Sequence, residues 1–70
     1  MKHLYLELKN QCLYYEPTGY DRDELYCLVE QELRDLELHR QGEWSELTDD
    51  QWNDLHQGVF TDLLETLEVE

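Results

Sequence analysis

The sequence predicts a small α+β domain, in which a β-hairpin over residues 3–16 precedes two antiparallel helices over residues 22–41 and 49–68. Two observations predict the helices: each region opens on a residue that caps helix N-termini, and each then repeats apolar residues with a period near 3.6. A third observation, the alternation of apolar residues near the N-terminus, predicts the strands. Seventy residues suffice for one domain, so we expect residues 1–70 to form a single small acidic unit.

The N-terminal segment fits two structures. If the chain turns at Asn10 and Gln11, a hairpin gathers on one face Leu4, Leu6, Leu8, Leu13 and Tyr15. If the segment is a helix, Leu6 and Leu13 point away from a stripe formed by Leu4, Tyr5, Leu8, Cys12 and Tyr15. The absence of an N-cap residue and the many tyrosines favour strands, whereas the lack of Gly at the turn disfavours them. We expect the hairpin, and an all-α three-helix bundle is the alternative.

The middle segment, after a turn at Pro17, Thr18 and Gly19, carries the signals of a helix from about residue 22 to 41. Asp21 and Glu24 have the spacing of a capping box, in which the two side chains each accept a hydrogen bond from a main-chain N–H at the helix start. An apolar face follows, formed by Leu25, Tyr26, Leu28, Val29, Leu33 and Leu36.

The last segment repeats this logic over residues 49–68. Thr48 and Gln51 have the spacing of a second capping box, and Asp49 and Asp50 stand in the first turn, where the helix dipole favours negative charge. The core-facing stripe consists of Trp52, Leu55, His56, Val59, Phe60, Leu63 and Leu67.

Charge is the strongest functional signal. The chain has 18 Asp and Glu against 5 Lys and Arg, a net charge of -13, and residues 41–70 contain no Lys or Arg at all. These carboxylates alternate with apolar residues at helical spacing, so they belong to a folded surface and not to a disordered tail. Such a surface repels nucleic acid and anionic lipid and attracts basic proteins.

Eight carboxylates are the candidate partner-binding residues. On the outer side of the last helix we expect Asp50, Asp54, Asp62, Glu65 and Glu68. On the middle helix, a row at intervals of seven residues, about 10 Å apart, consists of Asp23, Glu30 and Glu37. We expect exposed aromatic residues such as Tyr14, Tyr20 or Trp44 to anchor the contact.

These features predict a non-enzymatic inhibitor that mimics the charge of a nucleic acid and blocks the basic binding site of a nucleic-acid-binding protein. In composition and size the chain is similar to phage-encoded inhibitors of restriction, CRISPR or DNA-repair enzymes, a likeness of class that rests on no shared motif. The alternative is a non-enzymatic adaptor or structural protein that acts through an apolar dimer or partner interface and is acidic only for solubility.

A weak second stripe on the middle helix favours that alternative. Cys27, Gln31, Arg34 and Leu38 stand at i, i+4, i+7 and i+11, so they share one side of the helix. This stripe predicts a homodimer interface at Cys27, Arg34 and Leu38, unless the N-terminal segment covers it.

Other chemistry has little support in the sequence. Glu32 and His56 fall within apolar stripes and could pair, although a Glu at the core boundary and a His bonded to the backbone explain them better. No His or Cys has metal-ligand spacing, and no nucleophile or phosphate-binding motif is present, so we expect no cofactor and no catalysis. Without a long apolar run or a secretion signal, the expected location is the cytoplasm.

Overall fold

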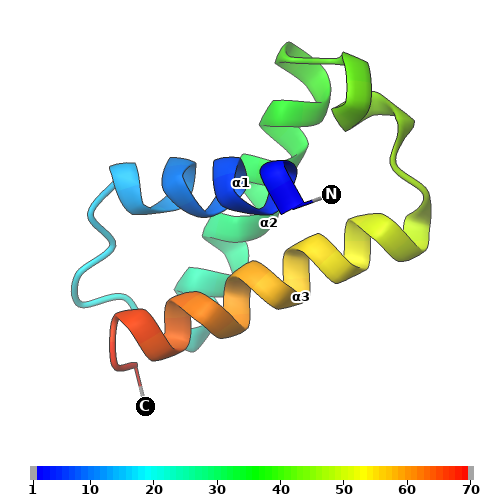
Figure 1. Ribbon diagram of the computed structural model, residues 1–70. Helices are drawn as coiled ribbons and strands as arrows, with labels where there is room; N and C mark the ends of the chain where they lie inside the picture. The colour runs from blue at the N-terminus through cyan, green and yellow to red at the C-terminus, as the bar shows by residue number, and fades with distance from the viewer. Residues whose placement is uncertain (1, 70) are drawn as a thin grey trace.

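The computed structural model describes residues 2–69, which form three α-helices and one short 3₁₀-helix. The α-helices are α1 (Lys2–Tyr14), α2 (Arg22–His39) and α3 (Asp49–Thr66), and the 3₁₀-helix η1 (Gly42–Glu46) lies between α2 and α3. Figure 1 shows α1 and α3 running in the same direction, with α2 running across them. Each α-helix contacts the other two, so the architecture is a three-helix bundle.

The predicted N-terminal hairpin is therefore wrong, because no strand occurs in residues 2–69 and residues 2–14 are helical. As a helix, this segment buries Leu4, Leu8 and Cys12 on one side, at i, i+4 and i+8, and leaves Leu6 49% exposed. A two-stranded hairpin would have left unpaired backbone groups along its edges, whereas a helix satisfies these groups within itself. The all-α alternative describes the structure.

Both predicted capping boxes are confirmed. The Glu24 N–H donates to Asp21 at 2.8 Å, and the Gln51 N–H donates to Thr48 at 3.2 Å. Each helix ends two residues before the predicted boundary, at His39 and at Thr66. After α2, two consecutive residues, Gln41 (φ 56°) and Gly42 (φ 61°), take left-handed backbone angles and break the helix.

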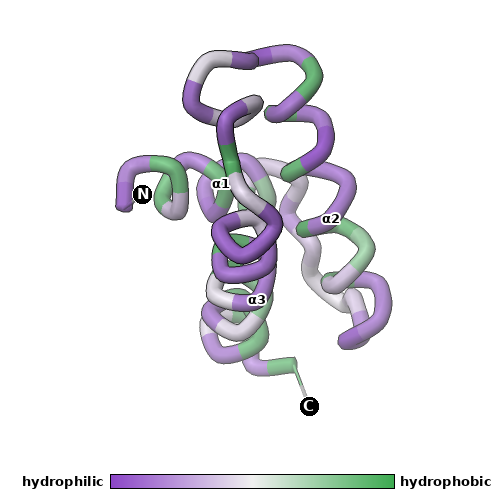
Figure 2. The backbone as a smooth tube through the Cα atoms, turned by 90° about the vertical axis from the view of Figure 1, so that its right-hand side faces the viewer, coloured by the Kyte–Doolittle hydropathy of each residue, from purple (hydrophilic) through white to green (hydrophobic). Residues whose placement is uncertain are grey.

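The buried core draws on every helix. It consists of Leu4, Leu8, Cys12, Leu25, Val29, Leu33, Leu36, Trp44, Leu55, Val59, Phe60 and Leu63. Trp44 belongs to η1 and is only 4% exposed, so the connection between α2 and α3 is part of the core rather than a loose loop. Figure 2 shows hydrophobic residues recurring at intervals along the helices between hydrophilic ones, the pattern of helices that each bury one side.

Among residues 2–69, the helices are too short or too polar to cross a membrane.

Leu6 and Leu8 provide a direct test of the N-terminal helix. Replacing the fully buried Leu8 with Ala leaves a cavity, so Leu8→Ala should lower the free energy of unfolding by about 2–5 kcal/mol. Leu6→Ala removes the same atoms from an exposed position and should change it by less than about 1 kcal/mol. Urea denaturation of both variants measures the difference. In a hairpin the two side chains share one face, so equal losses would contradict the helix.

Candidate protein-binding surface

The outer side of α3 carries the candidate surface. The Thr48 capping box starts the helix in a register that turns Leu55, Val59 and Leu63 into the core. The opposite side is exposed and carries, in order, Asp50, Asp54, Gln57, Thr61, Glu65 and Glu68, the last lying just beyond the helix end. We call the four carboxylates Asp50, Asp54, Glu65 and Glu68 the acidic face.

The acidic face is divided into two pairs. At about 1.5 Å of rise per residue, Asp50 and Asp54 lie about 6 Å apart along the axis, and Glu65 follows about 17 Å after Asp54. The neutral Gln57 and Thr61 fill the interval. The second pair stands at the C-terminal end of α3, which has no basic residue in its last turn, although the helix dipole disfavours negative charge there.

Four of the five Lys and Arg side chains make contacts away from the acidic face, and the fifth, Lys2, lines a pocket with Asp54. Lys9 pairs with Asp62 at 2.9 Å, Arg34 with Glu30 at 2.8 Å, and Arg40 with Glu7 at 2.7 Å. Arg22 lies over the ring of Phe60, 5.9 Å from its centroid. Within residues 2–69, the four carboxylates of the acidic face make no ion pair.

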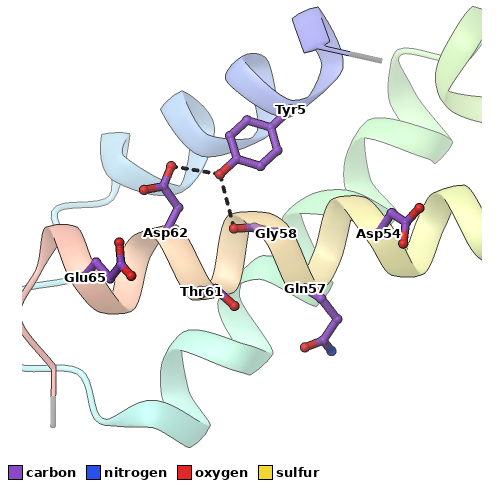
Figure 3. Close-up of a pocket in the computed structure, with 7 residues that line it drawn as sticks. All are labelled: Tyr5, Asp54, Gln57, Gly58, Thr61, Asp62 and Glu65. Atoms are coloured by element: carbon purple, nitrogen blue, oxygen red, sulfur yellow. Dashed lines mark hydrogen bonds between the residues drawn. The ribbon is translucent and has the colours of Figure 1, made fainter.

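A shallow groove between α1 and α3 borders the acidic face (Figure 3). Its lining consists of Tyr5, Asp54, Gln57, Gly58, Thr61, Asp62 and Glu65. The Tyr5 hydroxyl donates to Asp62 Oδ2 at 2.8 Å and also lies 3.2 Å from the Gly58 carbonyl oxygen. Because Asp62 also holds Lys9, it joins α1 to α3 and is less available to a binding partner than Asp54 or Glu65.

Gly58 and Tyr5 were not predicted to matter. A Cβ atom at position 58 would stand 3.0 Å from the Tyr5 ring, so glycine is what allows the ring to lie this close to α3. A glycine in a helix interior costs about 1 kcal/mol relative to alanine. A glycine in the middle of a predicted helix therefore signals a close approach, and this signal could have been read from the sequence.

The contacts around Tyr5 shift two pKa values in opposite directions. The hydrogen bonds from Lys9 and Tyr5 lower the pKa of Asp62 below its ordinary value of 3.8. Burial, followed by the hydrogen bond to Asp62, raises the pKa of Tyr5 to about 12. At neutral pH this cluster therefore holds a carboxylate and a neutral phenol.

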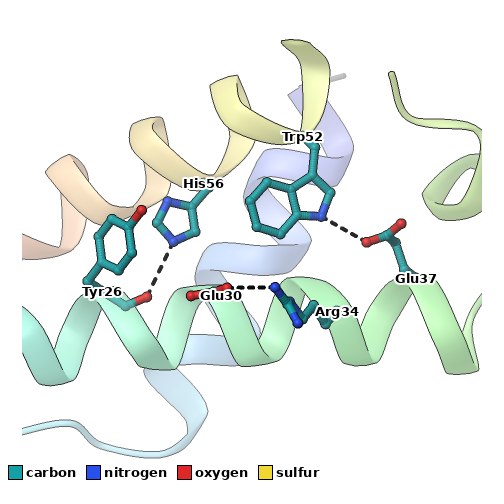
Figure 4. Close-up of polar contacts among 6 residues, drawn as sticks. All are labelled: Tyr26, Glu30, Arg34, Glu37, Trp52 and His56. Atoms are coloured by element: carbon teal, nitrogen blue, oxygen red, sulfur yellow. Dashed lines mark hydrogen bonds and ion pairs between the residues drawn. The ribbon is translucent and has the colours of Figure 1, made fainter. Parts of the chain in front are cut away.

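The predicted row on α2 does not stand free in solvent. Figure 4 shows Glu30 bonded to Arg34 and Glu37 turned toward α3, where the Trp52 indole N–H donates to it at 2.8 Å. Asp23 is exposed. Asp23 is thus the one carboxylate of this row without a side-chain partner among residues 2–69. Most of the unpaired candidate carboxylates therefore lie on α3.

The predicted dimer stripe on α2 is solvent-accessible. Cys27 and Arg34 are exposed, and Leu38 is 66% exposed, so the N-terminal segment does not cover them. Among the proposed aromatic anchors, Tyr14 is 80% exposed, Tyr20 is partly buried, and Trp44 is buried in the core. Only Tyr14 of these three has the exposure that such a role requires.

Glu32 and His56, which could have formed a buried pair, bind different groups. The His56 Nε2 atom donates to the Tyr26 carbonyl oxygen at 3.3 Å, and the imidazole stacks on Trp52. Glu32 accepts a hydrogen bond from Gln11 Nε2 at 3.4 Å, in the contact between α1 and α2. Both are buried polar residues with hydrogen-bond partners, as a structural role requires.

The chemistry that this surface supports is ionic binding. No group of three or more His, Cys, Asp or Glu side chains in residues 2–69 is arranged to hold a metal ion. A scan of protein-family models, a search of curated proteins and a search of solved structures each found no match to this chain.

A double-mutant cycle tests the close contact of Gly58 with Tyr5. In a Tyr5→Ala background, Gly58→Ala should raise the free energy of unfolding by about 1 kcal/mol, because alanine favours the helix. With Tyr5 in place the gain should be smaller or negative, since the new methyl group meets the ring. Thermal unfolding of the four proteins measures the coupling. An equal gain in both backgrounds would mean that the ring does not lie against position 58.

The lowered pKa of Asp62 predicts how the contribution of its contacts with Lys9 and Tyr5 to stability depends on pH. Because the folded state lowers this pKa, ionised Asp62 stabilises the protein above its unfolded value near 4, and this stabilisation is lost as the pH falls through the folded value. Asp62→Asn should therefore be less stable than the wild type at pH 7, with a difference that shrinks below pH 4. Urea denaturation at several pH values measures it, and the exposed Asp54→Asn serves as control. A difference that is constant with pH would contradict the ionic role.

Proposed function

We propose that this protein binds a basic protein through the acidic face of α3 and blocks a site that otherwise holds nucleic acid. Asp50, Asp54, Glu65 and Glu68 engage Lys and Arg side chains of the target, and the inhibition is competitive occupancy of the nucleic-acid site. The observation that carries the proposal is an exposed side of α3 with four carboxylates, none of which forms an ion pair with another of the described residues 2–69.

The position of Glu65 and Glu68 supports the proposal that the acidic face serves binding and not solubility alone. Acidic residues at a helix C-terminus oppose the helix dipole, so Glu65 and Glu68 reduce stability, whereas the same charges elsewhere on the surface would serve solubility without this cost. The same is true of the whole face, because an uncompensated row of like charges repels itself. Charges kept where they destabilise the fold are expected of a surface that serves binding.

The spacing of the acidic face supports mimicry of a field rather than of individual phosphates. Duplex DNA presents a phosphate about every 3.4 Å of axis on each strand, whereas the two acidic pairs of α3 lie about 17 Å apart. Lys and Arg side chains are long and flexible, so a basic groove can close on pairs of carboxylates without matching the phosphate repeat. A partner of this kind binds less tightly as salt screens the charges.

Matched charge variants test the proposal. Asp54→Asn, Glu65→Gln and Glu68→Gln together remove three charges from the acidic face, and Glu16→Gln, Asp35→Asn and Glu46→Gln remove three exposed charges elsewhere. Tagged proteins are incubated with host lysate, bound proteins are eluted by a salt gradient, and displacement by duplex DNA is measured. The α3 triple variant should bind at least about tenfold more weakly to partners that DNA displaces, whereas the control should bind like the wild type.

A stability measurement separates binding from folding in this experiment. The α3 triple variant should unfold at the same temperature as the wild type or higher, because it relieves repulsion at the helix C-terminus. Partners that resist high salt, ignore DNA and bind both triple variants equally would contradict the proposal.

A second candidate is the adaptor function, favoured by the 66% exposure of Leu38. An apolar side chain this exposed, on the same side of α2 as Cys27 and Arg34, suits a contact that tolerates salt. In the same assay, Leu38→Glu would then abolish binding that the α3 triple variant retains.

A further inference from the structure

A small pocket lies between α1 and α2, and no residue of α3 lines it. Its volume is about 240 Å³, and its lining consists of Gln11, Glu32, Asp35, Leu36, His39 and Arg40. Four of these residues stand on α2 at i, i+3, i+4 and i+7, so they share one side of that helix. Sites for drug-sized ligands measure roughly 300–1,000 Å³, so this pocket suits a smaller group.

Glu32 distinguishes this pocket from the others. It is 5% exposed, and no other carboxylate of residues 2–69 is buried. Gln11 Nε2 donates to it over 3.4 Å, a long hydrogen bond. Hydrogen bonding to Glu32, and then its charge, raises the pKa of Tyr15, so the Tyr15 hydroxyl is a neutral donor. A carboxylate accepts hydrogen bonds at roughly four positions, so these two donors leave acceptor positions for a ligand in the pocket.

The charge of Glu32 has no counterion within the described part of the chain. No ion pair among residues 2–69 includes it. Arg40 lines the same pocket, but its guanidinium pairs with Glu7 of α1 at 2.7 Å. Asp35 adds a second negative charge to the lining, and burial together with the charge of Glu32 raises the pKa of Cys12 to about 12. Because a buried charge without a counterion is costly, a cation in this pocket would be bound favourably.

We propose that this pocket binds a primary ammonium group, with Glu32 as its counterion. An ammonium group has three N–H donors, and three side chains of the lining present acceptors, namely the carboxylates of Glu32 and Asp35 and the amide oxygen of Gln11. The Gln11 nitrogen already donates to Glu32, which leaves the amide oxygen as the acceptor. Leu36 supplies apolar surface for the methylene groups that follow an alkyl ammonium.

Other small ions fit this lining less well. An anion would meet the charges of Glu32 and Asp35. A metal ion needs several ligands at once, and no group of three or more His, Cys, Asp or Glu side chains in residues 2–69 is arranged to hold one. A quaternary ammonium has the required charge but no N–H to donate, so it would leave the acceptors without hydrogen bonds.

A titration with n-butylammonium at constant ionic strength, followed in NMR spectra of the ¹⁵N-labelled protein, is the first test. The side-chain amide of Gln11 and the backbone amides of residues 35–39 should shift and saturate. Tetramethylammonium carries the same charge without N–H groups, so it should bind at least about tenfold more weakly. Equal affinity for both cations, or shifts confined to the acidic face of α3, would overturn the proposal.

Variants of the two carboxylates test which side chains hold the cation. Glu32→Gln keeps the shape and the contact with Gln11 but removes the charge, so it should weaken butylammonium binding at least about tenfold. Asp35→Asn changes an exposed residue, which spares the fold, and should weaken binding about threefold. The matched control Glu30→Gln makes the same change on α2 outside the pocket and should bind like the wild type. Wild-type affinity in either folded pocket variant would overturn the proposal.

Two further probes distinguish the sources of such a group. Tighter binding of 1,4-diaminobutane than of the amide of Nα-acetylated lysine would identify a free polyamine as the ligand, and the reverse order would identify a lysine side chain of another protein. Either order supports the ammonium site, and failure of both probes to bind overturns it. These measurements use no basic target protein, so their failure would leave the proposed role of the acidic face untouched.

Discussion

The imbalance between eighteen carboxylates and five Lys and Arg residues constrains the whole fold. Three of these cations act between elements: Lys9 joins α1 to α3, Arg40 reaches back from the end of α2 to α1, and Arg22 lies over Phe60 of α3. Surface ion pairs contribute only about 0–1 kcal/mol each, so the buried leucines hold the bundle together. The cations matter because Lys9 and Arg40 pair with Asp62 and Glu7 where the helices touch.

Because Lys9, Arg22 and Arg40 lie at helix contacts, none of them pairs with the carboxylates on the outer side of α3. Its acidic face persists because Leu55, Val59 and Leu63 hold the opposite side of the same helix in the core. A surface of this kind opposes stability, and that opposition is why we propose that it serves binding.

The sequence predicted α2 and α3 well and α1 poorly, for a physical reason. Asp21 with Glu24 and Thr48 with Gln51 are local devices, since every atom involved lies within one turn of the helix they start. The first helix has no N-cap residue, and its leucines at positions 4, 6 and 8 also fit a strand. Packing of Leu4, Leu8 and Cys12 against the other two helices decides between them, and that packing is not local.

The acidic face, too, could be predicted from the sequence only as far as local features determine it. The sequence by itself determined that the protein is acidic, that the carboxylates of the last segment lie on a helix, and that no Lys or Arg from that segment offsets them. Periodicity and composition suffice for these statements because they concern one helix at a time.

Only the tertiary structure decided which carboxylates stay unpaired. Glu37 accepts a hydrogen bond from Trp52, and Asp62 is bonded to Tyr5 and Lys9. These contacts join residues far apart in the chain, so the sequence pattern of one helix does not reveal them. The burial of Trp44 in the core is of the same kind. Leu6 likewise lies in solvent only because residues 2–14 form a helix whose other side is buried. Helical period places a side chain on a side of its helix, but the neighbouring elements determine whether that side faces water, a cation or the core.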